Sequence, residues 1–304
     1  MIRDMARILV SGLINIETTL RVEQFPIPYF PVTYPFHGIG SSVSGVGYNV
    51  AKALTTLGHD VRFLSLVGQD VAALQAREAL RTDGIDDRFV LSGLKQTAQS
   101  VILYEPTGRR QIHVDLKDIQ ESTLPPGGFE EAAEGCDLAV LCNINFSRPL
   151  LMMALKRGLP VATDVHALAS LDDAYDRDFL EAADILFMSH ENLPVPAADI
   201  AHSILGRFRA RIVVIGQGAA GALVVSRSRG VALVPAVSVR PIVSTIGAGD
   251  ALFSAFIHGH VNGLDPETAL RRSVVFAAWK IGESSASQGF LDAAGLDEAC
   301  KAGC

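Results

Sequence analysis

The chain has 304 residues and a formal net charge of −7, and 49% of its residues are hydrophobic while 19% are charged. This length fits one large domain or two small ones with a substantial core, and the apolar content excludes a disordered chain. The acidic balance argues against a nucleic-acid partner, and the absence of an apolar run of roughly 20 residues argues against a membrane span, so we expect a cytoplasmic protein.

The first part of the chain predicts two strand–helix units. Apolar runs that end at glycine or precede a helical period mark these elements. They are strands over 7–11 and 61–67 and helices over 45–57 and 72–80. The stretch 13–44 contains four prolines and predicts short strands and loops. A strand followed by a helix, twice, is typical of parallel βαβ units.

An antiparallel hairpin interrupts this order. Residues 100–114 alternate around Pro106, Thr107 and Gly108, which predicts two strands and a turn. Together with residues 13–40, this hairpin could build a small sheet over one edge of the core. Arg109 and Arg110, near the turn, are expected to be solvated.

After the hairpin, the alternation of strands and helices resumes. The expected strands cover 137–142, 160–164, 184–189, 211–215 and 221–225, and the expected later helices cover 247–260 and 267–281. Helices are also expected between the first three of these strands. The core is therefore predicted to be an α/β sheet with helices on its faces.

Residues 216–221 match the pattern GxGxxG with Gly216, Gly218 and Gly221. This pattern indicates a dinucleotide site only where a helix follows the glycines. Here the strand-like segment 222–226 follows instead. The sequence therefore predicts a turn between two strands and argues against a nicotinamide cofactor.

The segment from Gly45 to Ala51 opens a predicted helix with small residues. Gly45 and Gly47 would let the backbone approach a ligand, and Asn49 would offer a donor and an acceptor in the first turn. Close packing of a helix start is the alternative explanation for the same residues.

The segment Ser244-Thr245-Ile246-Gly247-Ala248-Gly249-Asp250 is the sharpest feature of the sequence. Its small residues precede an apolar helix, whose free amides and dipole favour an anion. Asp250 could be only a charge complement to the helix dipole. Alternatively, the amides stabilise a transferring phosphoryl group, and Asp250 accepts a proton from the attacking hydroxyl.

Other reactive side chains favour structural roles. The four cysteines lack CxxC spacing and are expected to be reduced thiols; they are Cys136, Cys142, Cys300 and Cys304. For Asp164 and His166, which follow a predicted strand, loop structure is favoured over a role near metal or phosphate.

These motifs, taken in order, resemble the PfkB (ribokinase-like) carbohydrate kinases along nearly the whole chain. The family's C-terminal signature, D-T-x-G-A-G-D, is matched by STIGAGD at 244–250, and its N-terminal signature by SGVGYNVA at 44–51. The start GLINIE at 12–17 is similar to the family's substrate segment G-x-x-N-x-D, and VGQD at 67–70 is similar to its V-G-x-D.

The resemblance implies a doubly wound three-layer α/β core, within a single domain over 1–304. It implies a small β-sheet lid built from segments of about 13–40 and 95–117. It also implies transfer of the γ-phosphoryl group of ATP to a hydroxyl of a small sugar, with Mg²⁺. A homodimer that pairs through the lid is plausible in this family.

The resemblance also implies roles for individual residues. Asp250 would be the catalytic base, beside the anion-hole amides of Gly247, Ala248 and Gly249. The acceptor would meet Asn15, Glu17, Gly45, Gly47 and Asn49. The nucleotide would meet Gly216, Gly218, Gly221, Thr245, Ala278 and Gly282. Glu191 would help to organise the metal.

Three departures from the family pattern affect the details. Ser244 replaces the first aspartate of the C-terminal signature, so a bound monovalent cation is expected to be weak or absent. Glu191 lies one place early relative to the family's N-x-x-E, and Glu17 replaces an aspartate.

Two other functions remain open. A nucleoside kinase would stack a base on Tyr48 or on the aromatic residues Phe30, Tyr34 and Phe36. A catalytically weak sugar-binding relative is the second alternative, because the segment 189–192 is altered.

Overall fold

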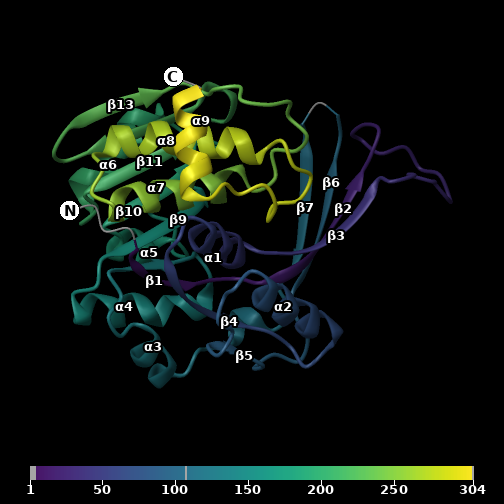
Figure 1. The fold of residues 1–304 in the computed structure, drawn as a ribbon, viewed down its shortest axis with the longest axis horizontal. Helices are drawn as coiled ribbons and strands as arrows, with labels where there is room; N and C mark the ends of the chain where they lie inside the picture. Colours follow the sequence, from purple (N-terminus) through teal and green to yellow (C-terminus); the bar gives the residue numbers. More distant parts are fainter. Residues whose placement is uncertain (1–4, 107, 303–304) are drawn as a thin grey trace.

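A nine-stranded sheet forms the centre of the molecule, and a separate four-stranded sheet stands at one side of it (Figure 1). The structure is a computed structural model that describes residues 5–106 and 108–302. The strands of the large sheet are, in spatial order, β13 (Gly230–Val234), β12 (Ala222–Ser226), β11 (Ile212–Gly216), β10 (Ile185–Ser189), β9 (Val161–Ala167), β8 (Leu138–Leu141), β1 (Arg7–Ser11), β4 (Asp60–Leu66) and β5 (Val90–Leu91).

Helices cover both faces of this sheet, which gives the predicted three layers. Strand β1 shows why, because successive side chains point to opposite faces. Leu9 belongs to a core with α3 (Pro126–Ala132), α4 (Arg148–Arg157), α5 (Arg177–Ala182) and α6 (Ala197–Arg207). Ile8 and Val10 belong to the core with α1 (Val46–Thr56), α2 (Val71–Thr82), α7 (Ala248–Val261) and α8 (Pro266–Lys280). The last helix, α9 (Ala293–Ala302), packs through Leu296 against this second layer.

The order of the strands reverses beside β1. Strand β1 pairs in parallel with β4 on one side and with β8 on the other, so Ser11 lies level with Leu64 and Leu141. In an open α/β sheet, such a switch point at the carboxyl ends of the strands is where a ligand binds. The segments that follow β1 and β8 therefore lie at the favoured position for a site.

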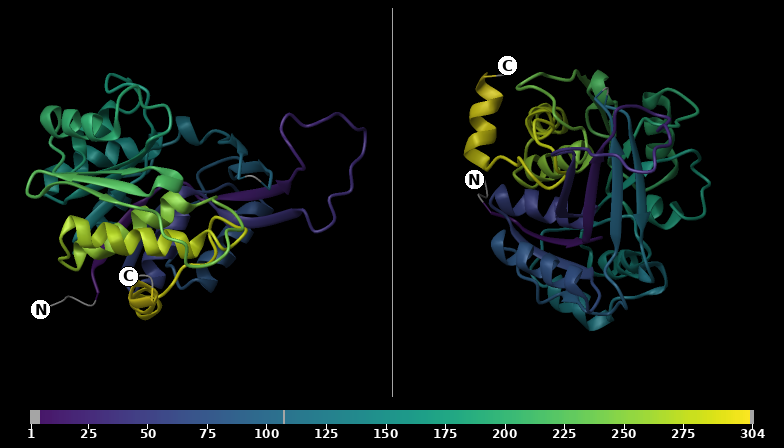
Figure 2. Two further views of the ribbon diagram at one scale, coloured as in Figure 1. Left: turned by 90° about the horizontal axis from the view of Figure 1, so that it is seen from above. Right: turned by 90° about the vertical axis from the view of Figure 1, so that its right-hand side faces the viewer.

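The four-stranded sheet, called the small sheet below, joins two distant parts of the chain. Its strands are, in order, β3 (Ile39–Ser44), β2 (Asn15–Arg21), β6 (Gln99–Tyr104) and β7 (Arg110–Asp115). The predicted hairpin of β6 and β7 is confirmed by its antiparallel register, although Thr107 at its turn lies outside the described residues. Residues 22–38 between β2 and β3 project away from the rest of the molecule (Figure 2).

Most strands agree with the sequence prediction. Residues 15–21 and 39–44 form short strands within the stretch 13–44, as expected, and Asn15 and Glu17 lie on the first of them. Strand β13 was not predicted, and it extends the sheet with antiparallel pairing beyond β12. Within the described residues, no helix is long and apolar enough to cross a membrane.

Candidate active site

The amino-terminal end of α7 forms the centre of the candidate site. Gly247 is its N-cap in the left-handed region (φ 77°), and a Cβ there would lie 2.6 Å from the carbonyl oxygen of Ala286. A Cβ at Gly249 would meet no atom within 4 Å, so the helix start faces open space there. Amides of a first helical turn lack intrahelical acceptors and favour an anion. The Ala248 amide, however, donates to Thr245 O at 3.2 Å, so it already has a partner.

Asp250 lies in the first turn of α7, and one of its two carboxylate oxygens accepts a hydrogen bond from another side chain. Its Oδ2 accepts a hydrogen bond from Asn49 Nδ2 at 2.7 Å. Burial raises the pKa of Asp250 to about 6, although the hydrogen bond from Asn49 opposes this shift. His166 and Lys280 also lower the pKa, whereas Asp164 raises it. A carboxylate with this pKa is mostly ionised at neutral pH and a better base than an exposed aspartate.

A line of polar contacts joins this aspartate to the small sheet. Asn49, on α1, donates to Asp250, and its Oδ1 lies 3.4 Å from Ser44 Oγ. Ser44 Oγ donates to Glu17 Oε2 at 3.0 Å. Four predicted or neighbouring site residues from four elements are thus brought together. Ser44 was missed as a functional residue, because only the cross-strand pairing of β2 and β3 places it between Asn49 and Glu17.

Asn15 and Glu17 supply polar atoms that the protein leaves without partners. Asn15 Nδ2 donates to Ser100 Oγ at 3.0 Å, but its buried Oδ1 has no hydrogen-bond partner, and neither has Glu17 Oε1. Burial raises the pKa of Glu17, against the hydrogen bonds from Ser44 and from the Ala286 backbone and against the charge of Lys280. Buried unpaired acceptors cost free energy, so these two atoms suit a ligand that brings hydroxyl donors.

Gly45 and Gly47 are explained by packing alone. Gly45 has a positive φ of 107°, and a Cβ there would lie 2.5 Å from Leu13 O. A Cβ at Gly47 would lie 2.4 Å from the carbonyl carbon of Gly12, so α1 begins directly against the segment after β1. Their contact with an acceptor stays a prediction.

The turn from Ser244 to Gly247, called the catalytic turn below, is anchored by the small sheet. Ile246 packs with Ile102 of β6 and with Ala286. Arg110 Nη1 donates to Thr245 Oγ1 at 2.8 Å. Arg110 is exposed, as expected, and the register of β6 and β7 also brings its guanidinium to the turn.

The residues predicted to bind the nucleotide, apart from Thr245 in the catalytic turn, lie in two places. The 216–221 segment joins β11 to β12, as predicted, and a Cβ at Gly221 would lie 2.1 Å from Val234 O. At the other place, Ala278 lies near the end of α8 and Gly282 follows it. A Cβ at Gly282 would lie 2.0 Å from Arg240 Nε, since this guanidinium packs over Trp279.

Glu191 follows β10 at the carboxyl edge of the sheet and is exposed. Its backbone amide donates to Ser189 Oγ at 3.1 Å. The described residues contain no group of three or more His, Cys, Asp and Glu side chains that would hold a metal by themselves. Glu191 is a single exposed carboxylate, and Mg²⁺ commonly keeps several waters and binds through substrate phosphates with one or two carboxylates.

Tyr48 does not face this site. Its side chain is 2% exposed, and its hydroxyl donates to Asp83, which also pairs with Lys52 at 3.0 Å. The ring therefore packs between α1 and α2, and the prediction that it stacks a base is wrong.

Comparison with known proteins agrees with this fold. The sequence profile described as "pfkB family carbohydrate kinase" matches residues 5–293. The chain belongs to the pfkB family. As a pfkB kinase, it is a phosphotransferase with a hydroxyl acceptor.

Relatives of this pfkB kinase differ in their named substrates. The chain is 28% identical to acarbose 7(IV)-phosphotransferase from Actinoplanes sp. over 95% of this chain and 96% of that protein. It is 29% identical to ATP-dependent ribose-1-phosphate kinase from Halopiger xanaduensis, over 93% and 94%. A solved microbiome-derived acarbose kinase superposes with a TM-score of 0.87 at 26% identity, covering 97% of this chain and 99% of that one.

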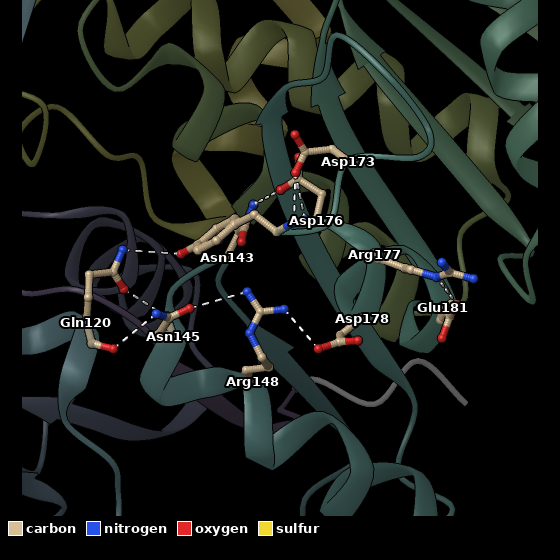
Figure 3. Close-up of polar contacts among 10 residues, drawn as sticks. Gln120, Asn143, Asn145, Arg148, Asp173, Asp176, Arg177, Asp178 and Glu181 are labelled. Atoms are coloured by element: carbon tan, nitrogen blue, oxygen red, sulfur yellow. Dashed lines mark hydrogen bonds and ion pairs between the residues drawn. The ribbon is translucent and has the colours of Figure 1, made fainter.

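A second polar network lies at the carboxyl ends of β8 and β9 in the pfkB kinase (Figure 3). Asn143 donates to Asp176 at 2.6 Å, and Asn145 is held by Gln120. Burial raises the pKa of Asp176, against the hydrogen bond from Asn143. The bond from Asn143 ties the segment after β8 to the start of α5, and the bonds of Asn145 tie the same segment to Gln120.

Proposed function

We propose that the protein is an ATP-dependent kinase that transfers the γ-phosphoryl group to a hydroxyl of a small sugar. The observation that carries this proposal is the line of polar contacts from Asp250 through Asn49 and Ser44 to Glu17. It joins a general base at a helix start to buried acceptor atoms that suit hydroxyl groups.

The small sheet provides the binding groups for the acceptor. Asn15 Oδ1 and Glu17 Oε1, which lack protein partners, accept hydrogen bonds from its hydroxyls. Gly45, Gly47 and Asn49 line the approach from α1. Fixing the acceptor beside Asp250 aligns the reacting oxygen, and positioning is the main contribution that a protein makes to phosphoryl transfer.

Asp250 then takes the proton of the reacting hydroxyl. The hydroxyl oxygen forms a bond to the γ-phosphorus, the bond from that phosphorus to the bridging oxygen breaks, and ADP leaves with the bridging oxygen. The amides of Gly247 and Gly249 stabilise the charge on the transferring group, with the dipole of α7 behind them. The partnered Ala248 amide contributes by holding the turn.

ATP is held at the turn between β11 and β12, by Gly216, Gly218 and Gly221, and beside Thr245, Ala278 and Gly282. Glu191 would hold Mg²⁺ through water. When bound with ATP, the metal neutralises the phosphate charge.

A nucleoside acceptor is the second candidate function. Tyr34 and Phe36 stack with ring centroids 6.3 Å apart in the projecting segment 22–38, and they are 76% and 85% exposed. Exposed aromatic faces suit a nucleobase as well as a sugar ring. A Burkholderia thailandensis nucleoside kinase has this fold, with a TM-score of 0.79 at 19% identity.

The deciding experiment is product detection with a panel of acceptors. The purified protein is incubated with ATP, Mg²⁺ and single sugars, phosphosugars, oligosaccharides or nucleosides, and phosphorylated products are identified by mass spectrometry. We expect a sugar product. A nucleoside monophosphate as the main product would replace the proposal with the second candidate, and no product with any acceptor would favour a catalytically weak sugar-binding protein.

We also propose that the enzyme works as a homodimer in the cytoplasm. The apolar side chains of Ile39 and Val101 share one face of the small sheet and are 64% and 43% exposed, and a second copy would cover them. The free thiols of Cys136, Cys142 and Cys300 agree with a reducing compartment, while Cys304 lies outside the described residues.

A further inference from the structure

A buried ammonium group lies next to the catalytic turn. Lys280 is the last residue of α8, and it is 0% exposed. Its Nζ donates a hydrogen bond to the carbonyl oxygen of Ile246. Burying a charged lysine costs free energy unless other groups compensate its charge, so a buried lysine at this position indicates a functional role.

The bond to Ile246 determines the direction of one peptide group. The Ile246 carbonyl and the Gly247 N–H belong to the same peptide, which is trans, and in a trans peptide the two groups point in opposite directions. A carbonyl held towards Lys280 therefore directs the Gly247 N–H away from it. That N–H is one of the two amides proposed to hold the phosphoryl group.

The ammonium also compensates two carboxylates of the site. The charge of Lys280 lowers the pKa of Asp250 and of Glu17, against the effect of burial on both. Burial in turn lowers the pKa of Lys280 to about 8, although Asp250 and Glu17 attract its charge. Lys280 therefore carries its charge at neutral pH, when Asp250 must be ionised to act as a base.

Other charged groups also act on Lys280 and Asp250. Glu283 favours the charged form of Lys280, and Arg240 disfavours it. Asp164 and His166 act on Asp250 from β9, with opposite signs. None of these groups donates to the catalytic turn through Ile246, which distinguishes Lys280 from them.

We propose that Lys280 is a positioning residue that serves as a built-in monovalent cation for the catalytic turn. It orients the Ile246–Gly247 peptide and keeps Asp250 ionised, so the reaction does not depend on added potassium. The proposal rests on the kinase function given above. It also supplies a cause for the cation independence expected from Ser244: the carboxylate that would attract an ion is absent, and a covalently tethered ammonium is present.

The test compares three variants in the purified full-length enzyme. Lys280→Met keeps most of the side-chain volume without the charge, and Lys280→Ala leaves space for a small cation. Lys52→Met is the matched control, because Lys52 pairs with Asp83 between α1 and α2, away from the turn. We expect kcat to fall about 10²-fold in both Lys280 variants, as for loss of an oxyanion-hole donor, and to stay unchanged in the control.

Added cations separate an electrostatic role from a packing role. At constant ionic strength, balanced with tetramethylammonium chloride, ammonium or potassium should restore kcat saturably in Lys280→Ala. Lys280→Met should not respond, since its side chain fills the space, and the wild type should not respond either. In Lys280→Met the acid limb of kcat/KM should move up by about one pH unit, because Asp250 loses an opposite charge.

A measurement without turnover keeps the two proposals distinguishable. The melting temperature of Lys280→Ala should rise saturably with ammonium chloride at constant ionic strength, and that of the wild type should not. If the wild type phosphorylates nothing but this response appears, the kinase proposal fails and the cation site remains. Wild-type kcat and an unshifted pH profile in Lys280→Met would overturn the inference. Loss of activity in both variants without rescue or pH shift would also overturn it.

Discussion

The catalytic turn and the projecting segment 22–38 are both irregular stretches of chain beside the small sheet, yet they are held very differently. Ile246 in the turn is 5% exposed and bonded to Lys280, while Thr245 is held by Arg110. In the projecting segment, Tyr29 and Phe36 are 88% and 85% exposed.

This difference corresponds to two functional requirements, one for phosphoryl transfer and one for selection of the acceptor. Groups that stabilise a transferring phosphoryl group must be placed accurately before the reaction, which requires support from several elements. Side chains that select an acceptor can be exposed and can vary without disturbing the core. We therefore assign phosphoryl transfer to the anchored turn and expect changes in the projecting segment to affect only the choice of acceptor.

The largest effect is expected at the anchored turn. Asp250→Asn should lower kcat about 10²-fold or more, with little change in the KM for ATP, because the base is lost while the amides remain. Asp199→Asn, in the first turn of α6, is the control for a simple effect on a helix dipole and should keep full activity.

The variant Asp250→Asn should not lose thermal stability. The folded-state pKa of Asp250 lies above its unfolded value, so its ionisation destabilises the fold at pH 7, and this cost disappears below about pH 4. A melting temperature at or above the wild-type value is expected for Asp250→Asn. A near wild-type kcat in this variant would remove Asp250 from the mechanism.

A smaller effect is expected for acceptor binding by the small sheet. Asn15→Ala should raise the acceptor KM about tenfold, because a hydroxyl and Ser100 Oγ each lose a partner. The KM for ATP serves as the internal control and should not change. Unchanged acceptor affinity in a calorimetric titration would show that Asn15 lies outside the site.

The pH dependence should show both ionisable groups near the turn. Values of kcat/KM should fall below about pH 6, where Asp250 takes up a proton, and above about pH 8, where Lys280 loses its charge. The loss should approach tenfold for each further pH unit on either side. Activity that stays level from pH 5 to pH 9, in an enzyme shown to remain folded, would contradict both assignments.

Substitution of Arg110 tests the hydrogen bond that joins the small sheet to Thr245 of the catalytic turn. Arg110→Ala should lower kcat/KM about threefold, which corresponds to the loss of one solvent-exposed hydrogen bond to Thr245. Arg109→Ala is the matched control, because Arg109 has 69% of its side chain exposed and points to Glu105 at 3.9 Å. Equal effects of the two substitutions would show that the contact has no role.

The smallest effect is expected in the projecting segment. Phe36→Ser should change kcat/KM for a sugar less than about twofold, since its ring is exposed in a segment that projects away from the rest of the molecule (Figure 2). For a nucleoside acceptor, the same substitution should cost about tenfold, because a stacking surface is lost. The ratio of the two effects therefore sharpens the choice between the two proposed acceptors.

The sequence predicted the features that depend on neighbours along the chain. The apolar run of β1, the helical period of α1 and the hairpin of β6 and β7 are local patterns, and each is confirmed. The glycines before Asp250 likewise predicted a helix start, since small residues and a following apolar period suffice for that inference.

Which way a side chain faces was less predictable. Tyr48 lies in the first turn of α1, but its position around the helix axis directs its ring towards α2 and Asp83. Arg110, at the edge of a hairpin turn, has the composition of a solvated residue, yet the small sheet carries it to Thr245. In both cases the packing of one element on another determined the contact.

Sequence alone therefore determined the order of the elements and the position of the helix start with its aspartate. Tertiary structure alone decided that Ser44 connects Glu17 to Asn49, and that Lys280 reaches Ile246 across 34 residues of sequence. A lysine in the last turn of a helix ordinarily faces solvent, where it complements the helix dipole. Here it is buried because the catalytic turn packs over the end of α8, and long-range packing of this kind leaves no mark in local composition or periodicity.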